Sequence, residues 1–428
     1  MSLEQQVAAL VESTNQLTKI VNDKQSEIDA KVNEALQASI GTVNHGVSRI
    51  GQGHDFETLT EALNYYGTKD IKYRDGNRQL ITLELQSGFV MSEQIFVYEG
   101  KKLDFLRITS VDPVVYIDHV ALNRTFWGRK CLIGVADGGA APRVETLFAF
   151  HSDTGEEVID GLYAKGPAAT AYIVQNCGIK NAPGNGLTVL GGAIVGASSA
   201  DFSGAKEHGL LAVEGGIVSA PAANFSGAGR SAACLSNSTA SLNRANLTNA
   251  GERGLFAYHG SVVSAEGADT SNSTLECVYA YQYSIVNFRQ GFANNAGTQG
   301  IFASEGAMIN AHAAEANDAT SIAIHASLNA KINAANAIAK NAGRHGCVAD
   351  FGSGINAHAA DFTGAQMGGV LSEAGSIVNA TDAKAQQGET TAATDIEVKR
   401  GSIISAHAAL GGTNVTPNTL VSDGIIFA

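Results

Sequence analysis

The chain has 428 residues, a formal net charge of −13 at pH 7 and only 16% charged side chains. An acidic chain without a basic stripe is a poor partner for nucleic acid, because phosphate binding needs clustered Lys and Arg. No stretch of about 20 uncharged apolar residues is present, so we expect no membrane insertion.

The cysteines and the first residues bear on where the protein is made. The five cysteines share no CxxC spacing, which argues against a metal site or a disulfide framework. The start, Met1-Ser2-Leu3-Glu4, lacks the basic and then apolar layout of a signal peptide. We therefore expect reduced cysteines, no metal, no cofactor and synthesis in a cytosol.

Residues 1–40 are predicted to form an N-terminal coiled coil. Its heptad positions alternate in steps of four and three: Leu3, Val7, Leu10, Thr14, Leu17, Val21, Lys24, Ile28, Lys31 and Ala35. Such a seam needs partner helices to cover it, which favours oligomerisation. The alternative is an amphipathic helix that lies on its own domain.

Residues 41–160 are predicted to form an N-terminal module with a capping helix and the first strands. Asp55 with Thr58 predicts the start of a helix, with Phe56, Leu59 and Leu63 on one apolar stripe and Gly67 as its stop. Short apolar runs that predict strands follow at 80–85, 95–98, 106–109 and 114–117. A helix and serial strands ahead of a repeat are typical of the plug at one end of a solenoid.

The strongest signal is a repeat of about 23 residues that begins near Gly186. One apolar column reads Leu187, Leu210, Ala233, Leu255, Val278, Ile301, Ile324, Cys347 and Val370. A second reads Val195, Val218, Ala240, Val263, Val286, Ile309, Ile332, Ile355 and Val378, and its last five members precede Asn287, Asn310, Asn333, Asn356 and Asn379, respectively. Alternation with period two, with Gly and Asn at the turns, indicates strands.

We therefore predict an all-β fold, a single-stranded parallel β-helix over residues 161–410, with a C-terminal end cap at 411–428. Helical solenoids need longer repeats, and the Leu-x-x-Leu-x-Leu frame of leucine-rich repeats is absent from the sequence. Successive coils stack about 4.8 Å apart, so equivalent residues lie above one another. The asparagine column is then able to hydrogen-bond along the axis.

The same alternation predicts an apolar strip on the outside of one sheet. If Leu255 and Ala257 face inward, their neighbours face outward. The strip comprises Phe256, Tyr258, Tyr279, Tyr281, Phe302, His325, Val348 and Leu371. A soluble monomer rarely displays so continuous a strip, which favours burial between subunits, with a binding platform as the alternative.

These features together resemble bacteriophage tail fibres and tailspikes. The resemblance rests on the coiled-coil start, the helix Asp-Phe-Glu-Thr-Leu-Thr-Glu-Ala-Leu at 55–63, the serial strands and the long Gly- and Ala-rich β-helix. It spans nearly the whole chain in architecture, and the 55–63 helix is its most specific element. It implies a right-handed, pectate-lyase-like β-helix that assembles as a homotrimer.

The resemblance also implies a function and partners. It implies a virion protein of the tail fibre, made in the host cytoplasm, whose N-terminal region attaches to tail or baseplate proteins. The rod would bind bacterial surface polysaccharide, O-antigen or capsule, for host recognition and adsorption. Three chains multiply weak contacts, so a shallow site suffices to hold a virion.

The alternative function is a tailspike depolymerase, a glycoside hydrolase or polysaccharide lyase. Glycoside cleavage needs two carboxylates roughly 5–10 Å apart beside a cleft. Glu315 and Asp361 are two repeats, about 9.6 Å, apart, and Glu305 lies close in phase to Tyr281. These three acids are the candidate catalytic residues, although solvated turns explain them more simply. The near-constant repeat length from 186 to 391 leaves little chain for the walls of a cleft.

An aromatic cluster is the candidate receptor-binding site. The run from Cys277 to Tyr283 breaks an otherwise Ala- and Ser-rich pattern. Aromatic rings stack on the apolar faces of sugars, and Arg binds anionic groups on them. The candidate sugar-binding residues are Tyr258, His259, Tyr279, Tyr281, Tyr283 and Arg289. Packing between subunits is the alternative role of this cluster.

Overall fold

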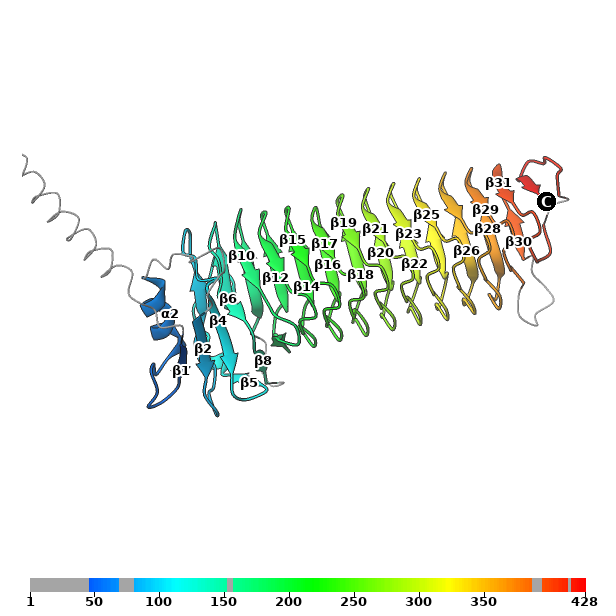
Figure 1. Cartoon of the computed structure of the whole chain (residues 1–428). Helices are drawn as coiled ribbons and strands as arrows, with labels where there is room; N and C mark the ends of the chain where they lie inside the picture. Colours follow the sequence, from blue (N-terminus) through cyan, green and yellow to red (C-terminus); the bar gives the residue numbers. More distant parts are fainter. Residues whose placement is uncertain (1–45, 69–80, 152–156, 387–394, 415–416) are drawn as a thin grey trace, which may run out of the picture.

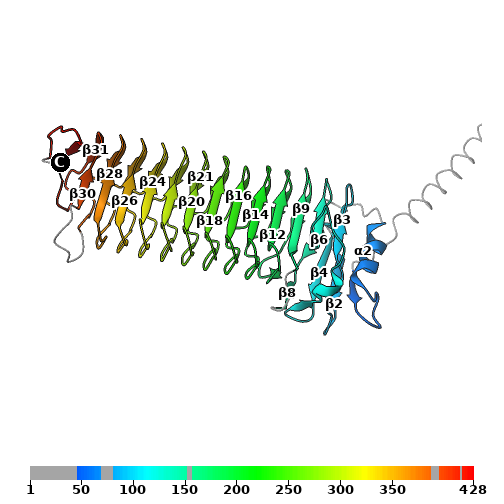
Figure 2. The ribbon, with the colours of Figure 1, turned by 180° about the vertical axis from the view of Figure 1, so that it is seen from behind.

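The computed structural model describes residues 46–68, 81–151, 157–386, 395–414 and 417–428. Within these ranges the chain forms one long rod of stacked coils, with α2 at one end and the C-terminus at the other (Figures 1 and 2). The coiled coil predicted for 1–40 lies outside the described residues. No helix in the described part of the chain is long and apolar enough to span a membrane.

The rod is a parallel β-solenoid, as the repeat predicted. Strands of successive coils pair in parallel, and the register joins the residues of the predicted apolar columns, for example Leu210 with Ala233 and Val286 with Ile309. Almost all regular structure is strand. In the described ranges the helices are α2 (Leu59–Gly67) and the short 3-10 helix η1 (His119–Ala121).

Two long sheets form two sides of the rod. We call the 13-stranded sheet of the described residues the aromatic sheet. Its strands, in order, are β3 (Ile95–Val97), β6 (Lys130–Ala136), β9 (Ile159–Lys165), β12 (Leu187–Leu190), β14 (Leu210–Val213), β16 (Ala233–Ser236), β18 (Leu255–Tyr258), β20 (Val278–Ala280), β22 (Ile301–Ala303), β24 (Ile324–Ala326), β26 (His345–Ala349), β28 (Gly368–Ser372) and β30 (Ile396–Val398).

We call the other long sheet, 12-stranded in the part of the chain that is described, the amide sheet. Its strands are β10 (Thr170–Tyr172), β13 (Ile194–Gly196), β15 (Ile217–Ser219), β17 (Thr239–Ser241), β19 (Val262–Ser264), β21 (Ile285–Asn287), β23 (Met308–Asn310), β25 (Lys331–Asn333), β27 (Gly354–Asn356), β29 (Ile377–Asn379), β31 (Ser402–Ser405) and β32 (Gly424–Phe427). Its central residues point inward and its flanking residues outward, as the burial pattern of β21 illustrates.

A third side of the rod is held by single bridges in place of strands. One residue of each coil pairs with the next coil along the column Gly178, Asp201, Asn224, Asn246, Asp269, Phe292, Glu315, Ile338, Asp361, Lys384 and Leu410. Left-handed backbone at the neighbouring corner explains why Asn and Asp recur there. Asn272, Asn295 and Asp318 have φ of 62°, 56° and 58°, values that these residue types tolerate.

The N-terminal module contains the predicted helix and strands. Thr58 caps α2, and its side chain and that of Glu61 form a capping box. Two smaller sheets follow: β1 (Val47–Ile50), β2 (Ile81–Leu85), β4 (Leu106–Ser110) and β7 (Arg143–Val144); and β11 (Gly178–Lys180), β8 (Leu147–Phe150) and β5 (Val115–Ile117). One hydrophobic core runs from Ile50 through the coils to Ile426, so module and rod share their interior.

Candidate functional site

The predicted outward strip lies on the aromatic sheet, where its rings stack on one another. Tyr279 lies 5.3 Å from Phe256 and 4.7 Å from Phe302 between ring centroids, and Phe302 lies 4.7 Å from His325. The interplanar angles are 14°, 6° and 15°, so each ring covers the face of the next. Burial raises the pKa of Tyr279 to about 12. These rings present edges, not faces, to a ligand.

The rest of this strip is covered by the chain itself. Val348 and Leu371 form a small buried cluster with Ile322. The guanidinium of Arg253 lies 4.7 Å from the centroid of Phe256, and its Nε donates to Glu276. The strip therefore points outward as expected but is half-buried or buried within one chain. Stacking of the rings on one another removes much of their surface from solvent before any second chain is added.

The strongly exposed apolar column lies instead on the amide sheet. Apolar residues one place before the inward column are 37–56% exposed over much of the rod, and they are Ile194, Ile217, Val262, Ile285, Met308, Ile377 and Ile403. Sequence reasoning used only the inward residues and the asparagines of these strands. The signal was available, because each exposed residue lies one place before an inward column residue and so faces outward.

A groove lies between this apolar column and the asparagine ladder. Its volume is about 480 Å³, and it is lined by Ile285, Asn287, Met308, Asn310, Lys331 and Asn333, with two strand residues below them. The ladder is formed as predicted: Nδ2 of Asn310 donates to Oδ1 of Asn287 at 3.0 Å, and Asn333 donates to Asn310 at 3.0 Å. Apolar side chains therefore border one edge of the groove and amides the other.

Tyr283 stands at the corner that leads into this groove. It is 77% exposed and has φ of 61°, a left-handed conformation that is costly for a bulky residue. Its ring lies over Gly306 so closely that a Cβ added to that glycine would be 2.7 Å from Cε1. One face of the ring thus rests on the next coil, and the high exposure leaves the rest to solvent.

The outward-facing residues of this coil alternate along the chain. Tyr283, Ile285 and Arg289 are exposed and Asn287 is half-buried, whereas the residues between them are buried. Tyr283 precedes β21 and Arg289 follows it, so the strand separates these two candidates. Aromatic ring, apolar side chain, amide and guanidinium thus cross the amide sheet within one coil.

The other candidate sugar-binding residues lie beside this corner or on the aromatic sheet. Tyr258 stacks on Phe256 at 4.7 Å, and His259 shares a hydrogen bond of 3.0 Å with Ser236. The hydroxyl of Tyr281 donates to Oε1 of Glu305 at 2.7 Å, and this hydrogen bond raises the pKa of the tyrosine. Glu305 is therefore next to the corner of Tyr283, one coil further along.

Glu315 and Asp361 lie on the third side of the rod, with Ile338 between them in the bridge column. Asp361 is close to two lysines: its Oδ2 lies 3.1 Å from Nζ of Lys340 and 4.0 Å from Nζ of Lys384. Burial raises the pKa of Asp361, but hydrogen bonds from Thr363 and Lys340 outweigh it and leave the pKa lowered. A carboxyl with a lowered pKa is poorly suited to act as a general acid.

The described residues contain no group of three or more His, Cys, Asp and Glu side chains that would hold a metal ion. No protein-family model matches the sequence, and no curated protein matches it. The functional proposal therefore rests on the geometry of the amide sheet and on the architecture of the rod.

Proposed function

We propose that the protein is a fibre protein of the bacteriophage tail-fibre and tailspike type, which binds bacterial surface polysaccharide for host recognition. The observation that carries the proposal is Tyr283, a ring that is 77% exposed and lies two residues before Ile285, which lines the groove. Aromatic rings are the surfaces on which sugar rings stack.

The groove supplies the other contacts that a glycan needs. The amides of Asn287, Asn310 and Asn333 repeat at one strand spacing, about 4.8 Å, and each carries donors and an acceptor. Ile285 and Met308 give an apolar border for the faces of sugar rings. A linear polysaccharide laid along the rod would meet the same pair of surfaces in coil after coil.

We further propose that three chains assemble into one fibre through the N-terminal heptads, with the amide sheet left open. In a parallel trimer around an axis along the rod, equivalent residues of the three chains meet at one level. Lys331 lies within the exposed apolar column of the amide sheet, so burial there would bring three ammonium groups together without a partner. The N-terminal region is then the part that attaches to tail or baseplate proteins in the virion.

The proposal takes the coil to be right-handed. Parallel strands of one sheet are joined by right-handed connections in about 98% of cases. A right-handed coil is also what the tailspike resemblance implies.

Binding is proposed in place of cleavage because of where the acids lie. Glu305 is hydrogen-bonded to Tyr281, and the equivalent residues one coil away on either side are Gln282 and Leu328. Neither supplies the second carboxylate that glycoside cleavage requires. Incubation with bound polysaccharide tests the depolymerase alternative directly: an increase of reducing ends or of unsaturated oligosaccharides would replace the binding proposal with cleavage.

The test is binding of the full chain to an array of purified bacterial O-antigens and capsular polysaccharides. We expect retention of one or a few glycans, with about five- to thirtyfold weaker binding by Tyr283→Ala, since stacking of one ring is worth about 1–2 kcal/mol. Phe351→Ala is the matched control, because Phe351 is an exposed aromatic at the same corner, three coils away. Equal binding by the Tyr283 variant and wild type would refute the proposed site.

A further inference from the structure

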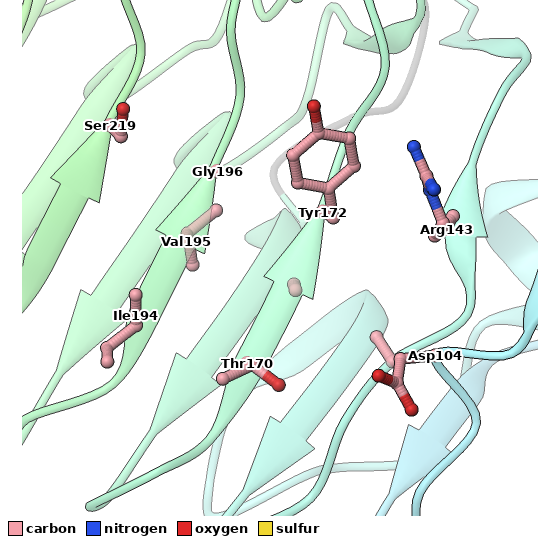
Figure 3. Close-up of a pocket in the computed structure, with 10 residues that line it drawn as sticks. Asp104, Arg143, Thr170, Tyr172, Ile194, Val195, Gly196 and Ser219 are labelled. Atoms are coloured by element: carbon pink, nitrogen blue, oxygen red, sulfur yellow. The ribbon is translucent and has the colours of Figure 1, made fainter. Parts of the chain in front are cut away.

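A second cavity lies on the amide sheet, where the rod meets the N-terminal module. Its volume is about 560 Å³, and its lining includes Asp104, Arg143, Thr170, Tyr172, Ile194 and Ser219 (Figure 3). These side chains come from β7, β10, β13, β15 and the loop before β4. One end of the N-terminal module and three successive strands of the amide sheet therefore build one pocket.

The ring of Tyr172 is fixed between two neighbours in this pocket. Tyr172 pairs with Gly196 across β10 and β13, and a Cβ on that glycine would lie 2.8 Å from Cδ2 of the ring. On the other side the guanidinium of Arg143 lies 4.8 Å from the ring centroid. In the next coils the position of Gly196 is taken by Ser219 and Ser241, so glycine occurs where the ring needs the space.

Arg143 is held in place with an unused donor. Its Nε is buried and has no hydrogen-bond partner among the described residues. The nearest oxygen of Glu145 is 3.9 Å away, too far for a hydrogen bond. The side chain as a whole is 31% exposed and lines the cavity, so the donors at its tip, unlike Nε, are available there. A guanidinium binds a carboxylate through charge-assisted hydrogen bonds, which makes a carboxylate the acceptor that suits this position.

We infer that this pocket binds a sugar residue that carries a carboxylate. Arg143 takes the carboxylate, the hydroxyls of Thr170 and Tyr172 lie within the same pocket for the hydroxyls of the sugar, and Ile194 supplies an apolar wall. The inference rests on the proposed function in one respect, that the ligand is a glycan. It adds the class of sugar and a second place on the rod.

The position of the pocket fits a polymer that also reaches the groove. From β10 to β21 the amide sheet advances by five strands, which is about 24 Å. Both sites open on the same sheet, and the groove contains Lys331 and is flanked by Arg289. Arg143 at the pocket, beside Asp104 and Glu145, and Lys331 and Arg289 at the groove are the cationic side chains available to an acidic polysaccharide.

The experiment compares methyl β-D-glucuronide with methyl β-D-glucoside by saturation-transfer difference NMR on the full chain. We expect the glucuronide to bind with a Kd about tenfold lower than that of the glucoside, because a charge-assisted pair adds to the neutral contacts. Arg143→Gln should remove this difference. Arg344→Gln, which changes an exposed arginine on another coil, should leave it unchanged.

A second variant separates loss of binding from loss of folding. Thr170→Tyr adds bulk within the pocket on the strand next to Arg143 and leaves the contact between Arg143 and Tyr172 in place, so it should block both sugars with an unchanged unfolding midpoint. Equal affinity for the two sugars in the wild type, or an undiminished glucuronide preference in Arg143→Gln, would overturn the inference. If Tyr283→Ala loses polysaccharide binding but still binds the glucuronide, the result supports the groove and does not affect the pocket inference. If the wild type binds the polysaccharide array but shows no preference for the glucuronide, the pocket inference is refuted and the proposed function is not.

Discussion

Tyr283 occupies a backbone position that glycine fills in other coils. Gly215, Gly260, Gly306 and Gly352 stand at the same corner with φ between 72° and 83°. Glycine adopts this region without a steric cost, whereas an L side chain costs roughly 1–2 kcal/mol there. A tyrosine at this position therefore costs stability that a glycine would not.

Replacing Tyr283 by glycine should separate stability from binding. We expect Tyr283→Gly to raise the free energy of unfolding by about 1 kcal/mol, because the left-handed strain is relieved and little buried surface is lost. Polysaccharide binding should fall as it does in Tyr283→Ala. Urea unfolding followed by circular dichroism measures the first effect. A destabilised Tyr283→Gly protein would show that the ring supports the fold, contrary to the proposed role.

Near the start of the aromatic sheet, side chains cap the backbone of the following coil. Oδ1 of Asp160 accepts from the backbone N–H of Asn185, Oδ1 of Asn185 accepts from that of His208, and Nδ1 of His208 accepts from that of Ser231. An imidazole accepts at Nδ1 only while that nitrogen is unprotonated. Burial, and next the charge of Arg230, lower the pKa of His208.

This series of side-chain caps predicts that the rod loses stability in mild acid. The folded state holds His208 neutral, so the unfolded chain binds the extra proton first as the pH falls. Stability should be full above about pH 6.5 and decline below it, by up to about 1.4 kcal/mol for each unit of pKa shift. His208→Asn, which copies Asn185, should reduce this decline. Unfolding midpoints in urea at pH 7.5 and pH 5.5 provide the comparison, and an identical pH slope in both proteins would contradict it.

At the scale of the strand, the asparagine ladder ties five coils together. Each bond runs from Nδ2 of one residue to Oδ1 of the residue before it, ending with Asn379 to Asn356 at 2.9 Å. A central member such as Asn333 both donates and accepts. The earlier coils carry Ser219, Ser241 and Ser264 at this position, so the ladder begins only where the groove lies.

Asn333→Ala should therefore cost more than removal of an end member. Loss of two side-chain hydrogen bonds at a partly exposed site predicts a decrease of about 1 kcal/mol in the free energy of unfolding, against about half that for Asn287→Ala. It should also weaken glycan binding, because Asn333 lines the groove. Thermal melts of the two variants test the order of their stabilities, which would be reversed or equal if the ladder did not contribute.

The repeat predicted these elements because stacking places like residues above like. Leu255 pairs with Val278 and Asn310 with Asn333, as the 23-residue columns required. Burial could not be predicted in the same way. Whether the ring of Tyr279 faces solvent depends on the rotamers of Phe256 and Phe302, which spacing along the chain does not specify. The pocket at Arg143 was missed for a related reason: Asp104, Ala141 and Arg143, which close it at one end, come from non-repeating segments whose contacts leave no periodic signal.

At the scale of the whole molecule, the rod is a single solenoid with one continuous core. Each coil contacts mainly its neighbours, so stability is a sum of local interfaces and the ends need protection. At the C-terminal end, Asn414 protects the edge of the aromatic sheet at β30. Its side chain accepts from the backbone N–H of Val398 at 3.0 Å and donates to the carbonyl of the same residue at 2.8 Å. An amide side chain thus takes the place of a further strand at this edge.

The oligomeric state distinguishes the heptads from the amide sheet as the interface. Sedimentation equilibrium of the full chain should give three times the chain mass of 44.2 kDa. A double change in the heptad, Leu10→Lys with Leu17→Lys, should yield monomer, because charges on the seam prevent helix association. Ile377→Lys, on the exposed column of the amide sheet, should leave the trimer intact. A monomeric Ile377→Lys protein would instead identify the amide sheet as the interface.

The parallel pairing of coils has a mechanical consequence. Hydrogen bonds between coils run along the rod, so tension applied at its two ends loads the coils in series and the three sides of each coil together. The tension is then shared by all the hydrogen bonds of a junction and is not carried by a single side chain. The rod should resist stretching until one junction fails as a unit, and the terminal turn at β32, supported by a neighbour on one side only, is where peeling would start.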